Sequence, residues 1–306
     1  MRLIVLIITL LLTGCSEDKT DPRLKIEDIA FESPAIEACI AKFVLAYELI
    51  YAEELTEFFC DAPAIQSTSD LKHFSNIKSI SFYELATTYG FNPQDFAQVS
   101  SFSLTLSIIS SLDISALTNL ESVEFTSNAK LTDVDFSYNT KLQKIYITRT
   151  PISSLNTDNM TELKELSYQG GFSVEVAGGL TSSLSVVNFA NNLKLEELSL
   201  GFLPLKEISL VGLDNLEIVR IQSPLEKVVF DLPNLRVLDL SGTELTEINL
   251  PLLPKLEALD NNYGKLERIN VDNNLQLNRL KLIENPLSEA TLEYLATLPD
   301  SIEVIL

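Results

Sequence analysis

Apolar residues recur in one spaced pattern along the chain from residue 55 onward. Each copy has an apolar residue, two others, a second apolar residue, one other and a third apolar residue. Successive copies start 19 to 22 residues apart, except for one step of 32 residues. Because the last two apolar positions flank a polar one, each copy predicts a short strand with apolar side chains facing inward. The copies are Leu55-Phe58-Cys60, Ile77-Ile80-Phe82, Val99-Phe102-Leu104, Leu120-Val123-Phe125, Leu142-Ile145-Ile147, Leu163-Leu166-Tyr168, Leu195-Leu198-Leu200, Leu216-Val219-Ile221, Leu235-Leu238-Leu240, Leu256-Leu259-Asn261 and Leu277-Leu280-Leu282.

A second series of the same pattern lies half a period after the first. It predicts that the segments between the first strands are extended rather than helical. Its members are Ile109-Leu112-Ile114, Leu131-Val134-Phe136, Leu184-Val187-Phe189, Leu205-Ile208-Leu210, Leu225-Val228-Phe230, Leu245-Ile248-Leu250 and Leu266-Ile269-Val271.

This repeat resembles the leucine-rich repeat, in the short form found in internalin-like bacterial proteins. The resemblance implies an α/β leucine-rich-repeat solenoid that is rich in strands and poor in helix. Each unit must stack on its neighbours to bury its apolar edge, so the core becomes one column. We expect a parallel concave sheet and an extended second strand on the back. Residues 235–245 fit the family consensus best, which places the first series on the concave sheet.

The buried asparagines of the family leave the choice of faces open. The first series has them at Asn128 and Asn285. The second series has asparagines at the same place in the repeat, at Asn139, Asn192 and Asn274. Either series therefore has some of the expected buried amides.

Helical patterns flank the repeats and predict a cap at each end. Ser33-Pro34 provides an N-cap and a first-turn proline for a helix from Ala35 to about Tyr51. Residues 288–298 form a second helical pattern with a serine cap, and residues 301–306 favour a last edge strand. The cap sequence around residues 31–60 resembles that of some exported bacterial leucine-rich-repeat lipoproteins.

The start of the chain has the pattern of an export signal. Met1-Arg2 precedes an apolar run from Leu3 to Leu12, which is shorter than the roughly 20 residues needed to span a bilayer. Leu12-Thr13-Gly14-Cys15 resembles the lipobox of bacterial lipoproteins, which implies cleavage before Cys15 and acylation of that cysteine. An ordinary signal peptide with an incidental cysteine is the alternative. Ser16 is not the aspartate that retains such proteins at the inner membrane, so the family rule favours the outer membrane of a Gram-negative bacterium.

These patterns divide the chain into five segments. An insertion at residues 169–183 holds four of the ten glycines and is expected to leave the regular column as a loop. The segments are a lipoprotein signal peptide at 1–14, a lipidated cysteine and flexible tether at 15–28, the helical N-terminal cap at 29–54, the solenoid at 55–286 and the C-terminal cap at 287–306.

With Cys15 acylated, Cys39 and Cys60 remain in an exported and oxidising setting. We predict a disulfide between them that closes a loop of about 20 residues and contributes on the order of 3 kcal/mol. It would join the cap helix to the first repeat strand. Two free buried thiols are the alternative.

Composition and charge exclude several classes of function. The chain has 22 Lys and Arg against 43 Asp and Glu, a net charge of −21, which opposes nucleic-acid binding. Its one histidine, His73, has no nucleophile motif beside it and is expected to be solvated or locally hydrogen-bonded. Phosphate loops, paired Cys-x-x-Cys motifs and metal-ligand spacings are absent from the sequence. We therefore expect no enzyme activity, no cofactor and no metal.

The middle outward row of the predicted strands brings charges together. A strand spacing of about 4.8 Å would place Arg220, Asp239, Asp260 and Lys281 on neighbouring strands. Adjacent aspartates repel unless they are paired, and each flanking cation could neutralise one. This ladder is either a recognition patch for a basic or amide-rich partner, or a row of internal salt bridges of little energetic value. A calcium site of Asp239, Asp260 and Asn262 is the weakest alternative, because the spacing of dedicated calcium loops is absent.

Other outward side chains suit recognition of a protein. Aromatic side chains give contact area, and short hydroxyls and amides nearby give adaptable hydrogen bonds. The same residue types are also common on solvated strands. The further candidates for partner binding are Tyr83, Glu124, Tyr146, Phe202 and Tyr263.

Together these features predict a non-enzymatic, lipid-anchored leucine-rich-repeat protein of the cell envelope. We expect a monomer that binds another protein through its concave face and contacts the membrane through its lipid anchor alone. The alternative is a structural envelope lipoprotein that binds glycan or peptidoglycan fragments.

Overall fold

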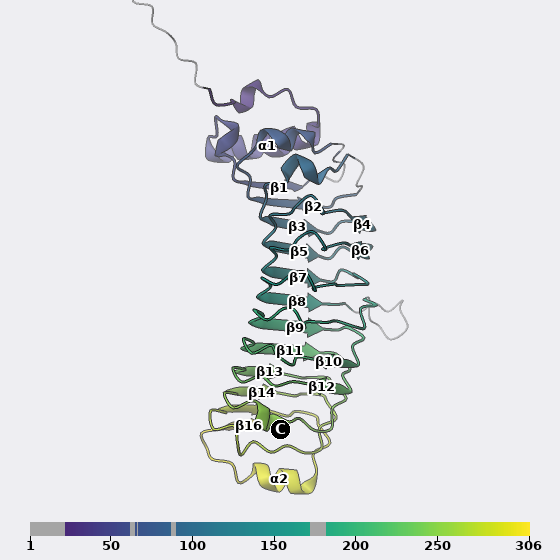
Figure 1. Ribbon diagram of the computed structural model, residues 1–306, viewed down its shortest axis with the longest axis vertical. Coiled ribbons are helices and arrows are strands. Elements are labelled where there is room, and N and C mark those ends of the chain that lie inside the picture. Colours follow the sequence, from purple (N-terminus) through teal and green to yellow (C-terminus); the bar gives the residue numbers. More distant parts are fainter. Residues whose placement is uncertain (1–21, 62–64, 66, 87–89, 172–181) are drawn as a thin grey trace, which may run out of the picture.

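The computed structural model describes residues 22–61, 65, 67–86, 90–171 and 182–306. Strands stack along one axis into an elongated solenoid (Figure 1). Twelve strands form one sheet in the order β1-β2-β3-β5-β7-β8-β9-β11-β13-β14-β15-β16, and all of its pairings are parallel. The first series of repeats therefore forms the long sheet, as predicted. The strands are β1 Glu57–Asp61, β2 Ser79–Tyr83, β3 Ser101–Thr105, β5 Ser122–Thr126, β7 Lys144–Thr148, β8 Glu165–Gln169, β9 Glu197–Gly201, β11 Ile218–Gln222, β13 Val237–Asp239, β14 Ala258–Asp260, β15 Arg279–Lys281 and β16 Glu303–Ile305.

The inward side chains of this sheet form one apolar column. In β5, Val123 and Phe125 are buried, whereas the three residues between and beside them face outward. Near the N-terminal end, Phe82, Phe102 and Phe125 pack ring against ring, with centroids 6.2 and 6.4 Å apart. Phe102 lies in register with Val123, so a large ring sits beside a smaller side chain on the next strand. This alternation of sizes fills the space between turns.

The back of the solenoid is extended, with only short paired strands. Two small parallel sheets join β4 to β6 and β10 to β12. Elsewhere on the back, the described residues form turns, unpaired extended segments or short 3-10 helices, so the back is less regular than the second series predicted. The back strands are β4 Ser111–Leu112, β6 Asp133–Val134, β10 Glu207–Ser209 and β12 Lys227–Val229, and the 3-10 helices are η1 Ile26–Asp28, η2 Ala52–Glu54, η3 Ser69–His73, η4 Pro93–Phe96 and η5 Leu250–Leu252. Of the 3-10 helices, η1 and η2 precede β1 and belong to the N-terminal cap.

The N-terminal cap is built on helix α1, Pro34–Tyr47. Ser33 is its N-cap, as predicted, and accepts a hydrogen bond from the backbone N–H of Ile36 at 3.4 Å. The carboxylate of Asp70 accepts two further bonds, each 2.9 Å, from the backbone N–H groups of Glu32 and Ser33. Since Asp70 belongs to η3, the start of α1 is fastened to the loop that leads into β2.

The end of α1 differs from the prediction. The helix ends at Tyr47 rather than near Tyr51, because Glu48 adopts a left-handed conformation with φ of 55°. The chain then runs extended, and Tyr51 forms an antiparallel bridge with Lys25. This bridge joins the segment before the helix to the segment after it.

The predicted disulfide between Cys39 and Cys60 is present. Cys39 lies in α1 and Cys60 in β1, and their Cα atoms are 5.4 Å apart. Both side chains are buried. The bond therefore ties the cap helix to the first strand of the sheet.

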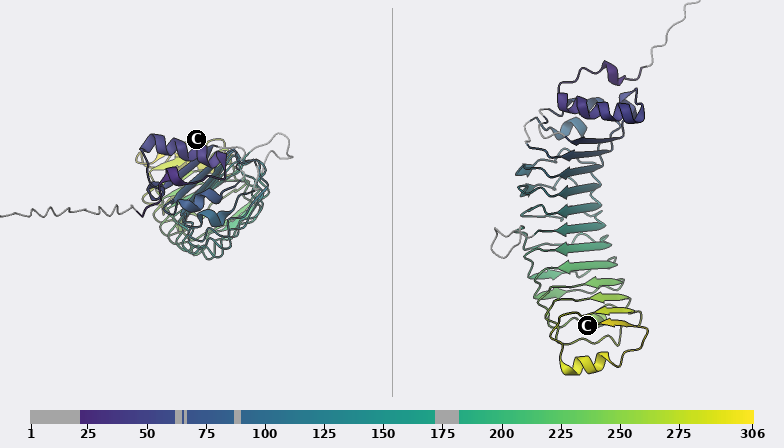
Figure 2. Two further views of the ribbon diagram at one scale, coloured as in Figure 1. Left: turned by 90° about the horizontal axis from the view of Figure 1, so that it is seen from above. Right: turned by 180° about the vertical axis from the view of Figure 1, so that it is seen from behind.

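The C-terminal cap contains helix α2, Glu289–Leu295, at the opposite end of the stack from α1 (Figure 2). Ser288 accepts a hydrogen bond from the backbone N–H of Thr291 at 3.3 Å, as a serine N-cap should. The helix is shorter than the predicted 288–298. Strand β16 then pairs with β15, which confirms the last edge strand.

Buried polar side chains join successive turns beyond the sheet. After the sheet strands, the backbone N–H of Ser107 donates to Asn128 Oδ1 at 2.9 Å, and that of Asn128 donates to Thr150 Oγ1 at 3.2 Å. On the back, Asn139 donates through Nδ2 to the carbonyls of Ile114 and Leu117 at 3.1 and 2.9 Å. Both series of repeats therefore use buried amides, which is why asparagine positions alone left the faces undecided.

Asn261 departs from this rule. It occupies an inward position that is leucine in the neighbouring repeats, and it is fully buried. Neither Nδ2 nor Oδ1 has a partner among the described residues. A Cβ on Gly264 would lie 2.5 Å from this Oδ1, so the Asn261 amide lies against the glycine. Burying an amide without partners costs about 1–3 kcal/mol.

We predict that Asn261→Leu raises the free energy of unfolding by about 1–3 kcal/mol, because it removes the unpaired amide and restores the repeat pattern. Urea unfolding followed by circular dichroism measures the effect. Asn139→Leu is the matched control, since Asn139 is equally buried but donates two hydrogen bonds. That variant is expected to lose stability, and an equal loss in both variants would contradict the assignment.

Candidate protein-binding face

The outward side chains of the twelve-stranded sheet form a continuous face of parallel rows. In-register pairing places Arg220 beside Asp239, Asp239 beside Asp260 and Asp260 beside Lys281. The four residues of the predicted middle row therefore do lie side by side on neighbouring strands. Their ion pairs and hydrogen bonds depend on the side chains.

The N-terminal part of the face is mostly uncharged. Ser81 lies in register with Ser103, and Tyr83 with Thr105, across β2 and β3. Tyr83 is half-buried. Glu124, on the next strand, is an exposed carboxylate that accepts a hydrogen bond from the Thr126 hydroxyl at 3.2 Å (the single polar contact of its carboxylate within the described residues).

Tyr146 is bound by neighbours within the face. Its hydroxyl donates to Glu165 Oε2, and Lys144 Nζ lies 2.6 Å from Glu165 Oε1. Burial, the hydrogen bond to Glu165 and its charge raise the pKa of Tyr146 to about 12. Burial also raises the pKa of Glu165, but the hydrogen bonds from Lys144 and Tyr146 outweigh it and hold that pKa below its usual value. Tyr146 is thus a fixed part of the surface rather than a free side chain.

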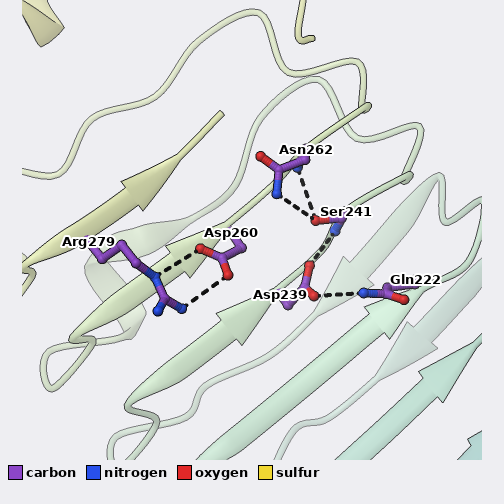
Figure 3. A network of polar contacts seen from close by, with 6 residues as sticks. All are labelled: Gln222, Asp239, Ser241, Asp260, Asn262 and Arg279. Atoms are coloured by element: carbon purple, nitrogen blue, oxygen red, sulfur yellow. Dashed lines mark hydrogen bonds and ion pairs between the residues drawn. The ribbon is translucent and has the colours of Figure 1, made fainter. Parts of the chain in front are cut away.

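The two aspartates of the ladder make separate sets of contacts (Figure 3). Asp239 accepts hydrogen bonds from Gln222 Nε2 and from the backbone N–H of Ser241, each 2.9 Å long. Asp260 instead forms an ion pair with Arg279, whose Nε and Nη2 donate to its two oxygens at 3.2 and 3.1 Å. Two parallel N–H bonds to one carboxylate are the strong form of this contact.

The expected pairing of the ladder was therefore wrong in detail. Among the described residues, neither Arg220 nor Lys281 forms an ion pair. Arg279 takes the place that Lys281 was expected to fill, because its planar guanidinium reaches the carboxylate of the neighbouring strand with two bonds. Arg220 is exposed and Lys281 is half-buried.

Apolar side chains accompany these charges. Ile218, Val237 and Ala258 occupy one outward row of β11, β13 and β14, in register with Arg279 of β15. Ile218 and Val237 are half-buried, and Ala258 is buried. We name the outward side chains of β11, β13, β14 and β15 the mixed-charge patch. They are Ile218, Arg220, Gln222, Val237, Asp239, Ala258, Asp260, Arg279 and Lys281.

Phe202 and Tyr263 lie in turns that follow sheet strands, and both have a left-handed backbone with φ of 56°. Tyr263 is 71% exposed and Phe202 is 36% exposed. Such φ values are uncommon for aromatic residues. Six other non-glycine residues among those described also have positive φ, and five of them, including Leu106, Ser127 and Arg149, lie in comparable turns. The conformation is thus a property of the repeat, and the exposed aromatic rings are the distinctive feature.

The calcium alternative finds no ligand cluster in the described part of the chain. In the described ranges, no group of three or more His, Cys, Asp and Glu side chains could hold a metal ion. Asp239 and Asp260 point to different partners, so the calcium hypothesis for them and Asn262 has no support. His73 is half-buried at the end of η3. No helix in the part of the chain that is described is long and apolar enough to cross a bilayer.

Two sequence predictions cannot be placed on this face. Cys15 and the signal segment lie outside the described residues, as does most of the insertion at 169–183. Sequence reasoning also missed four residues of the patch, which are Ile218, Val237, Ala258 and Arg279. Each stands two positions before a member of the middle row on its own strand, and alternation along the strand could have found all four.

Comparison with known proteins supports the fold. No family model matches the sequence, and no curated protein matches it. A chain of the octameric complex of Latrophilin 3, Unc5D and FLRT2 (LRR) is similar with a TM-score of 0.64 and 18% identity, over 83% of this chain and 88% of that one. An internalin, InlF, from Listeria monocytogenes has a TM-score of 0.60 and 19% identity, over 92% of this chain and 91% of that one.

The functional domain of InlJ from Listeria monocytogenes is also similar, with a TM-score of 0.61 and 16% identity over 82% of this chain. The match covers 51% of that structure, so this chain spans about half its length. The repeat spacing, the parallel sheet and these likenesses together show a leucine-rich-repeat solenoid. Because the sequence identities are below 20%, these comparisons show a shared fold and nothing about function.

Tyr146 and Tyr168 give a prediction for alkaline pH. Burial is the largest cause that raises the pKa of each to about 12, against an ordinary value of 10.0. The contribution of each neutral phenol to stability is complete below pH 10, and it is lost as pH rises through the folded-state value. We expect Tyr146 and Tyr168 to ionise late in a near-ultraviolet absorbance titration, together with Tyr294, whose pKa burial also raises, and stability to fall over the same interval.

Phenylalanine variants test which tyrosines these are. Tyr146→Phe and Tyr168→Phe should each remove one late step, whereas Glu165→Gln should move only the step of Tyr146 to lower pH. A single transition near pH 10 for all nine tyrosines in the folded protein would contradict the expectation.

Proposed function

We propose that this chain is a lipid-anchored leucine-rich-repeat protein that binds another protein through the outward face of its sheet. The observation that carries the proposal is the mixed-charge patch, where half-buried Ile218 and Val237 adjoin charged side chains on a rigid sheet. Protein interfaces likewise combine apolar contact area with polar and charged side chains. The comparison structures include a chain from an octameric protein complex, which supports a protein partner for this fold.

The proposal includes no enzyme activity. The candidate face offers carboxylates, guanidinium groups and amides that bond to each other, without a nucleophile held by a base. His73 stands apart from this face, on η3 before β2.

We further propose that Cys15 anchors the protein to the outer membrane of a Gram-negative bacterium. The support is the lipobox-like sequence Leu12-Thr13-Gly14-Cys15 at the end of an apolar run. Several acyl chains on one cysteine give a stable anchor, whereas a single chain does not. Cys39 and Cys60 form a disulfide, which leaves Cys15 as the thiol available for acylation.

Metabolic labelling with an alkyne-bearing fatty acid tests the anchor. The full chain is expected to take up label and to sediment with the outer membrane, and Cys15→Ala is expected to lose both. The double variant Cys39→Ala/Cys60→Ala is the matched control and should keep the label. An unlabelled wild-type chain, or label that persists in Cys15→Ala, would show that this cysteine is not the anchor.

A binding assay with envelope extract tests the protein partner against the glycan alternative. The purified chain is immobilised and exposed to extract with or without prior digestion by a protease. Binding that digestion abolishes is expected for a protein partner. Binding that survives digestion but is lost after muramidase treatment would instead favour peptidoglycan, and no binding from either extract would contradict the proposed function.

A further inference from the structure

We infer that the mixed-charge patch selects a partner segment that is acidic and apolar, with Arg220 and Lys281 as the groups that bind its carboxylates. This inference deepens the proposed function and rests on it. It differs from both interpretations of the sequence, a recognition patch for a basic or amide-rich partner and a row of internal salt bridges. The reason lies in which charges of the patch are already paired.

The negative charges of the patch are used within the protein. Asp260 is held by two bonds from Arg279, and its side chain is only 21% exposed. Asp239 accepts from Gln222 and from the Ser241 backbone, one bond to each oxygen. A basic partner would have to compete with these contacts, and removing a charge-assisted bond from a half-buried carboxylate is costly.

Of the three cations of the patch, only Arg279 is paired within the described part of the protein. Arg220 and Lys281 have no ion pair among the described residues. Two glutamates border the patch on the neighbouring strands, because Glu197 of β9 is in register with Ile218 and Glu303 of β16 is in register with Arg279. The net charge of the surroundings therefore does not attract a carboxylate. An acidic partner would instead be held by direct contact of its carboxylates with Arg220 and Lys281, since interactions between exposed charges are screened beyond about 8 Å at physiological salt.

The spacing of the unpaired cations fits an extended segment. Arg220 and Lys281 are in register through β13 and β14, so three strand steps, or roughly 14 Å, separate their backbones. A segment crossing the strands could place one carboxylate at each end. Beside this row, Ile218 and Val237 offer apolar contact. The ligand class is thus a peptide or loop with acidic residues flanking apolar ones.

Selection from a random peptide library against the immobilised full chain tests the inference. We expect selected peptides to be rich in Asp and Glu near apolar residues. The variant Arg220→Gln/Lys281→Gln should bind them at least tenfold more weakly, because charge-assisted hydrogen bonds are lost. Lys227→Gln/Arg268→Gln is the matched control, since it removes two exposed cations from the back of the solenoid. It should leave peptide binding within about twofold of wild type, because these cations are distant from the patch and screened.

Asp260→Asn gives a change of opposite sign. It frees Arg279 and is expected to tighten acidic peptides about threefold or more, whereas a patch for basic partners would lose affinity. Selected peptides that are basic, no selection at all, or equal losses in the two double variants would overturn the inference. If envelope extract binds but Arg220→Gln/Lys281→Gln does not weaken that binding, the inference fails while the proposed function stands.

Discussion

Stacking between neighbouring turns is the interaction on which the rest of the structure depends. A single turn exposes an apolar edge and two rows of unpaired backbone groups, and neither can be satisfied within the turn. Parallel pairing along the sheet and buried polar links such as Ser107 to Asn128 satisfy both at once. Because every turn is held in the same way, outward side chains stand in straight rows. The candidate site exists because the core is periodic.

The repeat period made much of this predictable. Alternation within each copy identified the inward residues, and the copy spacing predicted which strands lie side by side. The cysteines followed from the export signal, and Ser33 marked the start of α1. The helix end was harder, since it depends on Glu48 adopting a left-handed backbone that no residue type in the sequence required.

The site was predictable in arrangement but not in bonding. Register placed Asp260 beside Lys281, yet the carboxylate bonds to Arg279. Which cation binds Asp260 depends on the length of the side chain and on the planar guanidinium, which can donate two parallel hydrogen bonds. The sequence pattern does not give this geometry. Asn261 shows the same limit in the core, because its position matched the apolar pattern while its amide went unpaired. Sequence periodicity locates side chains, and local geometry decides their partners.

The disulfide gives the solenoid a preferred direction of unravelling. Nearest-neighbour structures lose turns from their ends, where each turn has one partner instead of two. At the N-terminal end, Cys39 and Cys60 lock helix α1 onto β1. At the opposite end, β16 and α2 are held by hydrogen bonds and packing alone. Turns are therefore lost first at the C-terminal end, and unfolding proceeds toward the disulfide. Strands β15, β14 and β13 are lost before the N-terminal strands of the sheet.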